Sequence, residues 1–450
     1  MANRYLTGNF APVTTEVTAT DLPVVGRIPA ALNGRYLRNG PNPVTPPDPA
    51  AYHWFVGDGM VHGIRLEDGA ARWYRNRWVR SRAVATALGE TWPGGPVHAD
   101  MDAAPNTNVI GHAGRTLALV ESGPVPYELT DELDTVGPTN LGATLPAGYT
   151  AHPKLDPVTG ELHAMAYWWG WGNQVQYIVI GRDGRVTRTV DVPTKGPTMM
   201  HDFSLTEHHV VVYDQPVIFD LDEAMKGVSF PYHWDDDYGS RVGVMPRAGT
   251  ADDIRWFEVD PCYVFHPMNA YDDGDDVVLD VVRHPRMFDR VRNGPDDGVP
   301  TLDRWTIDRS SGKVIEERLD DRGQEFPRVD ERVVSRRHRY GYAALADDTI
   351  VSDLSQPRSG LVKHDVEKGT SEVHAFTVNA GPAEGVFVPS SPDADEDDGY
   401  VLAVVYDPDR DGSDLVILAA QDFTGEPVAR VQLPQRVPFG FHGNWLPDEN

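Results

Sequence analysis

The chain has 450 residues, of which 40% are hydrophobic and 24% are charged, as in an ordinary globular protein. Its formal net charge of −28 argues against nucleic acid or an anionic lipid surface as a partner, because like charges repel. The one cysteine, Cys262, excludes an intramolecular disulfide and a thiolate metal cluster, so a metal would need histidine or carboxylate ligands.

The first residues, "MANRYLTGNFAPVTTEV", lack the basic-then-apolar pattern of a signal peptide. Nowhere do about 18 apolar residues run together, as a membrane-spanning helix would require. We therefore expect a soluble, cytoplasmic protein.

Short runs of β-branched and aromatic residues, each closed by a turn, recur along the chain. The 42 glycines and 37 prolines suit these turns, and no amphipathic helix of convincing length interrupts the pattern. The pattern predicts an all-β fold. In chain order, the clearest runs are residues 114–123, 175–186, 209–219, 276–284, 349–355 and 399–412.

The length of this pattern favours one architecture within the all-β class. No break in composition marks a linker, so we expect one domain over residues 1–450. A sandwich or barrel is rarely this long, whereas a β-propeller is, because its blades repeat around an axis. Seven blades would use about 64 residues each, although no WD or kelch signature recurs to fix the number.

Four of the 16 histidines share a setting at a strand start or turn, next to proline, aspartate or glycine. Taken singly, each is best interpreted as a hydrogen-bonded turn histidine. Their spacings are far too long for a local metal motif such as HExxH, but the inner strands of separate propeller blades all approach one axis. The four are His152 in "YTAHPKLDP", His201 in "TMMHDFSLT", His266 in "YVFHPMNAYD" and His442 in "PFGFHGNWLP".

Four neutral imidazoles without a thiolate suit a borderline divalent ion, namely Fe(II), Zn, Cu or Ni. Four ligands leave two positions of an octahedral ion open, which a purely structural site would not need. This arrangement favours an iron that binds dioxygen.

The histidine segments and several others, in this order, resemble the carotenoid cleavage oxygenase family, the nonheme iron enzymes that split alkenes. The resemblance covers nearly the whole chain, and its strength lies in the number of segments in register. They are residues 24–43, 53–66, 105–129, 150–167, 325–330, 383–407 and 441–445.

The resemblance implies a seven-bladed propeller with the metal on its axis and loops forming a cap over one face. It implies that His152, His201, His266 and His442 bind Fe(II). It also implies three glutamates that accept hydrogen bonds from the ligating imidazoles, which fixes their tautomer and aim and leaves one histidine with another partner or water. These glutamates map onto Glu121, Glu325 and Glu384.

Two further positions match segments of the family. Thr107 in "PNTNV" falls where related enzymes place a methyl group near one open iron position. Phe55 in "HWFVGDGM" matches a phenylalanine that lines the family's cavity, although Val56 replaces the usual aspartate beside it.

The implied reaction is cleavage of a C=C bond of a carotenoid or apocarotenoid by O₂, giving two carbonyl products. The first alternative is a stilbene or another 4-hydroxyphenyl alkene. Family members that cleave phenols carry a lysine just before the first of the three glutamates, and this chain has Val120 there. An isomerase variant of the same site stays open, as does the identity of the double bond.

Other residues that could suggest a site have simpler interpretations. We expect His62 to be structural, and His208 and His209 to follow His201 within one strand. The acidic run 392–400 lacks EF-hand spacing and is interpreted as a solvated turn. The tryptophan cluster at 167–172 suits core or crevice lining better than membrane contact.

Few partners are implied beyond O₂ and an apolar alkene. We expect no nucleic acid, at most peripheral membrane contact, and no protein partner. Two rivals come from other classes: a calcium-dependent propeller hydrolase, which would need carboxylate and asparagine ligands at the axis, and a non-catalytic propeller that binds partners on its rim.

Overall fold

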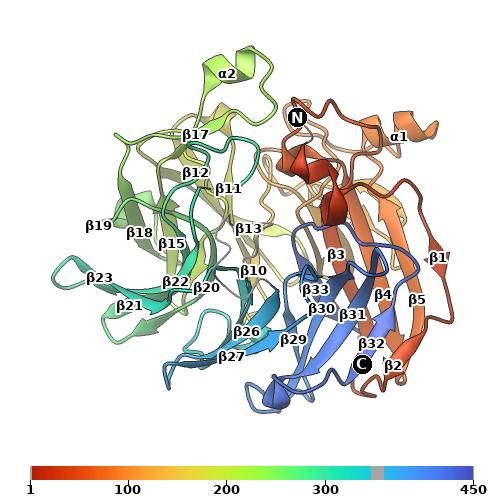
Figure 1. The fold of residues 1–450 in the computed structure, drawn as a ribbon. Coiled ribbons are helices and arrows are strands. Elements are labelled where there is room, and N and C mark those ends of the chain that lie inside the picture. The colour runs from red at the N-terminus through yellow and green to blue at the C-terminus, as the bar shows by residue number, and fades with distance from the viewer. Residues whose placement is uncertain (1–2, 296, 346–358, 449–450) are drawn as a thin grey trace.

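The computed structural model describes residues 3–295, 297–345 and 359–448. The run expected at 349–355 lies outside the described residues. In the described part, seven of the eight sheets have four to six strands, and the eighth is a two-stranded hairpin. The seven larger sheets surround a common axis as blades (Figure 1), so the predicted all-β, seven-bladed propeller is confirmed.

The blades follow one another along the chain, each with its innermost strand first except in blades 1 and 7. Blade 2 contains β6 (Asn108–His112), β7 (Arg115–Leu119), β8 (Tyr127–Leu129) and β9 (Thr135–Pro138). Blade 3 contains β10 (Lys154–Leu155), β11 (Leu162–Tyr167), β12 (Gln174–Ile180) and β13 (Val186–Pro193). Blade 4 contains β14 (Ser204–Leu205), β15 (His209–Asp214), β18 (Ser240–Pro246) and β19 (Arg255–Val259). Blade 5 contains β20 (Tyr263–Asp273), β21 (Asp276–His284), β22 (Thr301–Asp308) and β23 (Lys313–Asp320). Blade 6 contains β24 (Gln324–Arg328), β25 (Tyr340–Leu345), β26 (Gly360–Asp365) and β27 (Thr370–Ala375).

Blades 1 and 7 combine strands from both ends of the chain. Blade 1 contains β33 (Gly443–Pro447), β3 (Gly34–Pro41), β4 (Gly59–Glu67), β5 (Ala70–Trp78) and β1 (Thr18–Ala19). Blade 7 contains β28 (Gly381–Pro382), β29 (Val386–Pro389), β30 (Gly399–Asp407), β31 (Gly412–Ala419), β32 (Ala429–Gln432) and β2 (Val24–Gly26). Because β33 pairs with β3 and β2 pairs with β32, strands from the two ends of the chain complete blades 1 and 7 and close the ring.

The strand patterns explain how the blades pack. Outer strands such as β13 and β23 alternate between more and less exposed positions, whereas inner strands are buried on both faces. Between blades 4 and 5, for example, Val211, Phe257, Leu279 and Trp305 share one hydrophobic cluster. Burying each such side chain contributes about 1.5–3 kcal/mol, and this packing fixes the positions of the inner strands.

Two expected strand boundaries were wrong. The run 209–219 divides into β15 and β16 (Val217–Phe219), because the chain leaves the blade at Asp214 and Pro216 cannot donate to a ladder. His201 does not share a strand with His208 and His209 either, since it precedes β14, while His208 lies in the next turn and His209 opens β15.

Loops and short elements cover one side of the ring, as the family resemblance implied. They include α1 (Arg82–Leu88), and α2 (Leu221–Met225) between β16 and β17 (Tyr232–Trp234) (Figure 1). These elements form the cap. Within the described residues, no helix has the length and apolar character needed to cross a membrane.

Candidate metal centre and its two cavities

Every blade places one notable residue at the start of its innermost strand. Because these strands surround one axis, the seven side chains approach one another. In chain order they are Thr107 before β6, His152 before β10, His201 before β14, His266 in β20, Glu325 in β24, Glu384 between β28 and β29, and His442 before β33.

The four predicted histidines form one buried cluster. Their ligand atoms all lie within 4.8 Å of one another, and the Nε2 atoms of His201 and His266 are 3.1 Å apart. Two nitrogens bound at right angles to one ion at about 2.1 Å would be about 3.0 Å apart, so this spacing fits a shared metal.

The loop before β33 shows how the backbone delivers His442. A Cβ on Gly40 would lie 2.8 Å from the Cα of Gly440, so the loop can pass this close to β3 only because both residues are glycines. The amide of Asn39 donates to the carbonyl of His442, which ties the histidine to blade 1.

Three of the four imidazoles each contact one of the predicted glutamates. In each pair the histidine Nδ1–H donates to the carboxylate, which leaves Nε2 directed at the cluster. The distances are 2.9 Å for His201 to Glu121, 2.6 Å for His266 to Glu325 and 3.0 Å for His442 to Glu384.

Burial and pairing shift the pKa values of His442, Glu384 and Glu325. Burial lowers the pKa of His442 to about 4, although Glu384 opposes this shift. Burial disfavours the ionised form of Glu384, but Arg328 and His442 outweigh it and lower its pKa to about 2. Burial also opposes ionisation of Glu325, whose pKa is nevertheless lowered by His266. Glu325 and Glu384 are therefore ionised acceptors at neutral pH.

His152 differs from the other three histidines. Its Nε2 is buried without a hydrogen-bond partner, and no described residue pairs with its other ring nitrogen. Burial lowers its pKa well below the usual value, so the ring is neutral. An unpaired, neutral imidazole nitrogen aimed at three others is a donor that lacks only a metal, and the set fits the iron(II) of the family that the sequence resembles.

Sequence reasoning missed His284, the last residue of β21. Its Nε2 donates to Glu325 at 2.8 Å, so this glutamate accepts from two imidazoles and also from the backbone N–H of Phe326. His284 has no motif of its own, but its cross-strand pairing with Tyr263, three residues before His266, places it beside the metal site.

A cavity of about 880 Å³ lies between the cluster and the cap. Phe55, Thr107 and Val120 line it, together with His201, His266 and His442. Phe55 contacts Phe230, Phe265 and Phe441 edge-on, with ring centroids 5.4–5.9 Å apart. No lysine or arginine is among the described residues that line this cap cavity.

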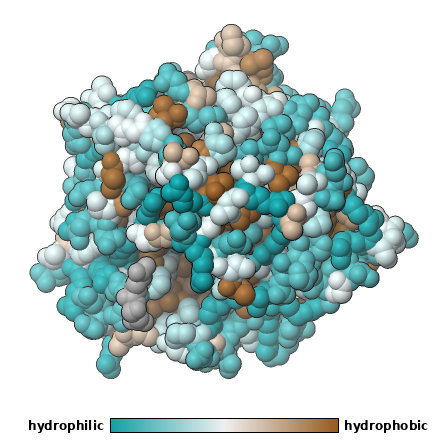
Figure 2. Space-filling view, turned by 180° about the vertical axis from the view of Figure 1, so that it is seen from behind, coloured by the Kyte–Doolittle hydropathy of each residue, from teal (hydrophilic) through white to brown (hydrophobic). Residues whose placement is uncertain are grey.

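The mouth of the cap cavity is apolar and exposed. Met225 in α2 is 80% exposed, and Trp169 stacks on Phe219 of β16 with ring centroids 5.3 Å apart. Figure 2 shows a mostly hydrophilic face, from which a partly hydrophobic lobe projects at the top, where α2 lies in Figure 1. The exposed apolar residues that also line the cavity are Val56, Trp169, Leu221, Met225 and Val228.

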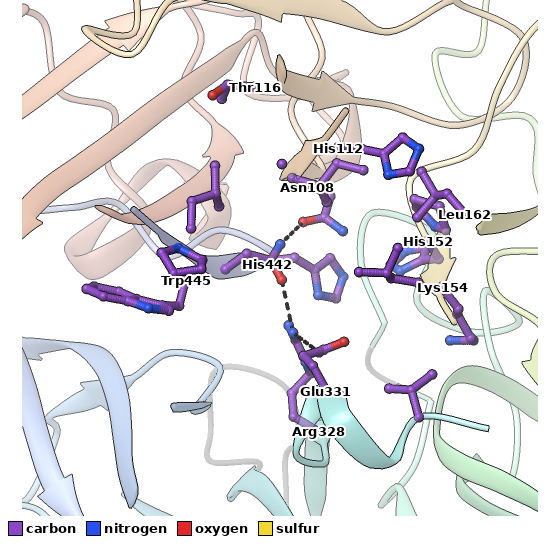
Figure 3. Close-up of a pocket in the computed structure, with 18 of the residues that line it drawn as sticks. Asn108, His112, Thr116, His152, Lys154, Leu162, Arg328, Glu331, His442 and Trp445 are labelled. Atoms are coloured by element: carbon purple, nitrogen blue, oxygen red, sulfur yellow. Dashed lines mark hydrogen bonds and ion pairs between the residues drawn. The ribbon is translucent and has the colours of Figure 1, made fainter. Parts of the chain in front are cut away.

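A second cavity, of about 1080 Å³, follows the inner strands away from the cap (Figure 3). His152, His266 and His442 line its inner end, and polar side chains such as Asn108 and Arg328 line its walls. We call it the axial chamber. His201 lines only the cap cavity and His152 only the axial chamber, so the cluster separates the two.

The remaining predicted residues lie away from the cluster. His62 is buried in β4, and its Nδ1 lies 2.8 Å from the Tyr74 hydroxyl, which fits a structural role. The acidic run forms a turn whose residues are mostly exposed or half-buried, as interpreted, and two of its carboxylates also make contacts within the protein. Glu396 accepts from the backbone N–H groups of Arg339 and Tyr340, and Asp397 pairs with Lys363 at 2.7 Å, so the run joins blade 7 to blade 6.

Comparisons with known proteins agree with this geometry. Residues 10–447 match the retinal pigment epithelial membrane protein family. The chain is 50% identical over 491 residues to a carotenoid cleavage oxygenase of Mycobacterium tuberculosis, covering 99% of this chain and 98% of that protein.

Solved structures extend the similarity to the fold. A lignostilbene dioxygenase of Pseudomonas brassicacearum matches with a TM-score of 0.88 and 29% identity, covering 99% of this chain and 98% of that one. A cobalt-substituted apocarotenoid oxygenase of Synechocystis matches with a TM-score of 0.86 and 26% identity over 97% of each chain. Since the family match spans nearly the whole chain and a relative is half identical over its full length, this chain belongs to the carotenoid cleavage oxygenase family and is an oxygenase.

Proposed function

We propose that this protein is an iron(II)-dependent dioxygenase that cleaves a C=C bond of a carotenoid or apocarotenoid with O₂ to give two carbonyl products. The observation that carries the proposal is the convergence of four buried imidazoles at the base of an apolar cavity. His152, His201, His266 and His442 would hold the iron. The iron supplies the capacity to activate O₂ toward an alkene.

The protein's own groups position the reactants and exclude water. Glu121, Glu325 and Glu384 hold three imidazoles by their Nδ1–H groups, which keeps the four-nitrogen set rigid before the substrate arrives. The aromatic walls around Phe55 bind the alkene and keep the site dry. Thr107 donates its hydroxyl to Asn106 at 2.9 Å, so we propose that its methyl group faces the cavity and narrows access to the metal.

The cap cavity supports an isoprenoid substrate over a phenolic one. Val120 lines the cavity where a phenol-cleaving enzyme would place a lysine, and no described lining residue supplies a cation for a phenolate. One observation favours the phenolic alternative: the hydroxyls of Ser122 and Tyr232 are paired at 3.0 Å on the cavity wall and could bind a substrate oxygen.

The exposed apolar residues at the cavity mouth support delivery of an apolar substrate by brief contact with a lipid phase. Leu221, Met225 and Val228 extend from the cap without a basic cluster that would bind anionic lipid. We propose peripheral contact only. We also propose that residues 1–450 act as one domain, since all seven blades contribute a residue to one site.

The test is metal content combined with O₂ uptake. Iron is measured in anaerobically purified parent protein, in a His201→Ala variant and in a His208→Ala control, whose histidine is exposed in a turn. O₂ uptake is then followed with an apocarotenal and with a 4-hydroxystilbene.

We expect about one iron per chain in the parent and the control, little in His201→Ala, and uptake with the apocarotenal. O₂ uptake with the stilbene alone would show that the substrate is a phenolic alkene rather than an apocarotenoid. A parent protein that lacks iron and cannot be reconstituted with it would contradict the proposed iron-dependent activity. Calcium in place of iron would favour the hydrolase alternative.

A further inference from the structure

The backbone that carries His152 is held by a chain of polar side chains at the inner end of the axial chamber. Asn108 donates from Nδ2 to the carbonyl of Ala151, the residue before His152, at 2.8 Å. The Oδ1 of Asn108 accepts in turn from Nδ2 of Asn444 at 2.9 Å. Figure 3 shows Asn108 near His152 and His442.

The series of side-chain contacts continues from Asn444 to His442. Arg328 donates to the Oδ1 of Asn444 at 2.9 Å and to the carbonyl of Gly443 at 3.0 Å. The same guanidinium forms an ion pair with Glu384 at 3.1 Å, and Glu384 accepts from His442. One series of contacts therefore connects the His152 loop to the carboxylate that orients His442.

These residues come from separate blades. Asn108 opens β6, Asn444 lies in β33 and Arg328 ends β24, while Ala151 precedes β10. Hydrophobic packing holds neighbouring blades together, but among the described residues no strand ladder joins the innermost strand of one blade to that of the next. A side-chain network between these strands therefore adds directional contacts that packing alone does not supply.

We infer that Asn108, Asn444 and Arg328 form a bracket that positions His152 for metal binding, in place of the carboxylate that this histidine lacks. The bracket acts on the backbone before the ring, whereas the three glutamates act on the rings themselves. These three are positioning residues, and the inference rests on the proposed function.

If the bracket positions His152, one result is expected that a purely stabilising network would not give. Releasing the His152 loop leaves the other three histidines with their glutamates, so the site should still bind metal but hold it less tightly and with altered coordination. Loss of a group that orients a metal ligand typically costs about 10–100-fold in metal affinity or activity.

The test uses Co(II), whose visible absorption reports coordination. The parent, Asn108→Ala and Asn444→Ala are loaded with Co(II), and its release to a chelator is timed. Asn76→Ala is the matched control, since Asn76 is also a buried asparagine and, from strand β5, bonds to the backbone of Thr15 and Val17. Melting temperatures are measured in parallel.

We expect Asn108→Ala and Asn444→Ala to release Co(II) about 10–100-fold faster, with a changed spectrum, while Asn76→Ala melts earlier but keeps parental release. The double variant should lose no more than the worse single, because both break one chain of contacts. If Asn108→Ala does not fold, the half-buried Asn444→Ala carries the comparison.

The bracket would be overturned if both variants released Co(II) at the rate of the parent and with the parent's spectrum. If the parent also bound iron and cleaved its substrate, the proposed function would still stand. A parent that binds neither iron nor Co(II) would overturn both.

Discussion

The cap cavity and the axial chamber meet at the same histidines but differ in character. The cap cavity, of about 880 Å³, has aromatic walls and no lysine or arginine among its described lining residues. The axial chamber, of about 1080 Å³, is lined by ion pairs and amides, including Lys154 paired with Asp202 at 3.0 Å and Arg328 paired with Glu384.

The difference indicates that the two sides of the metal site have different roles. The apolar side offers room and dryness to an alkene, and the polar side holds the inner strands in register. Carboxylates that orient imidazoles reach the cluster from strands lining both cavities, so the site is rigid although its two faces differ. The following changes test whether the two sides are separable in this way.

The largest effect is expected where one residue serves two imidazoles. Glu325→Ala leaves both His266 and His284 without an acceptor, and iron affinity should fall by about 100-fold. Iron content and turnover per bound iron are the measurements. Glu317→Ala, on exposed strand β23, is the control, and iron retention equal to the parent in Glu325→Ala would contradict the role.

A cation placed in the cap cavity should change substrate choice without loosening the metal. In Val120→Lys, the ammonium group can pair with a phenolate, and a charge-assisted hydrogen bond is worth about 1.5–3 kcal/mol. We expect the ratio of kcat/KM for a 4-hydroxystilbene over an apocarotenal to rise by about tenfold or more. Val120→Leu is the matched control, and an unchanged ratio in Val120→Lys would refute the substrate argument.

The smallest effect is expected at the cavity mouth. Met225→Glu replaces an exposed apolar contact in α2 and should lower kcat/KM for a micelle-dispersed carotenoid by about two- to fivefold, through KM alone. Val378→Glu, which exposes a similar apolar side chain away from the mouth, should have no effect. Equal losses in both variants would show that surface charge, rather than position, matters.

The fold class could be predicted from local sequence, and the members of the histidine cluster from the local setting that they share together with the family resemblance of their segments. Apolar runs bounded by turns predict strands, and a propeller brings the starts of its inner strands together. Four histidines that are far apart in the sequence therefore meet once the ring of blades has formed. The oxygenase class, predicted from the same segments, is confirmed by the family match.

Features that depend on tertiary pairing could not be read in this way. His284 reaches Glu325 through the packing of β21 beside β24, and Asn108 reaches Asn444 across most of the chain's length. Neither contact leaves a spacing or composition signal. The break of 209–219 at Pro216 was readable from proline chemistry, but the cap function of the following hairpin was not.

The pairing of β33 with β3 has a consequence for biosynthesis. His442 directly precedes the strand that closes the ring, so the four-histidine cluster cannot assemble until residue 442 has left the ribosome. During translation blades 2 to 7 can stack before β33 has been made, but blade 1 waits for this innermost strand. Iron can therefore find its complete set of ligands only after all seven blades have been synthesised, which makes metal loading follow ring closure rather than accompany the folding of the first blades.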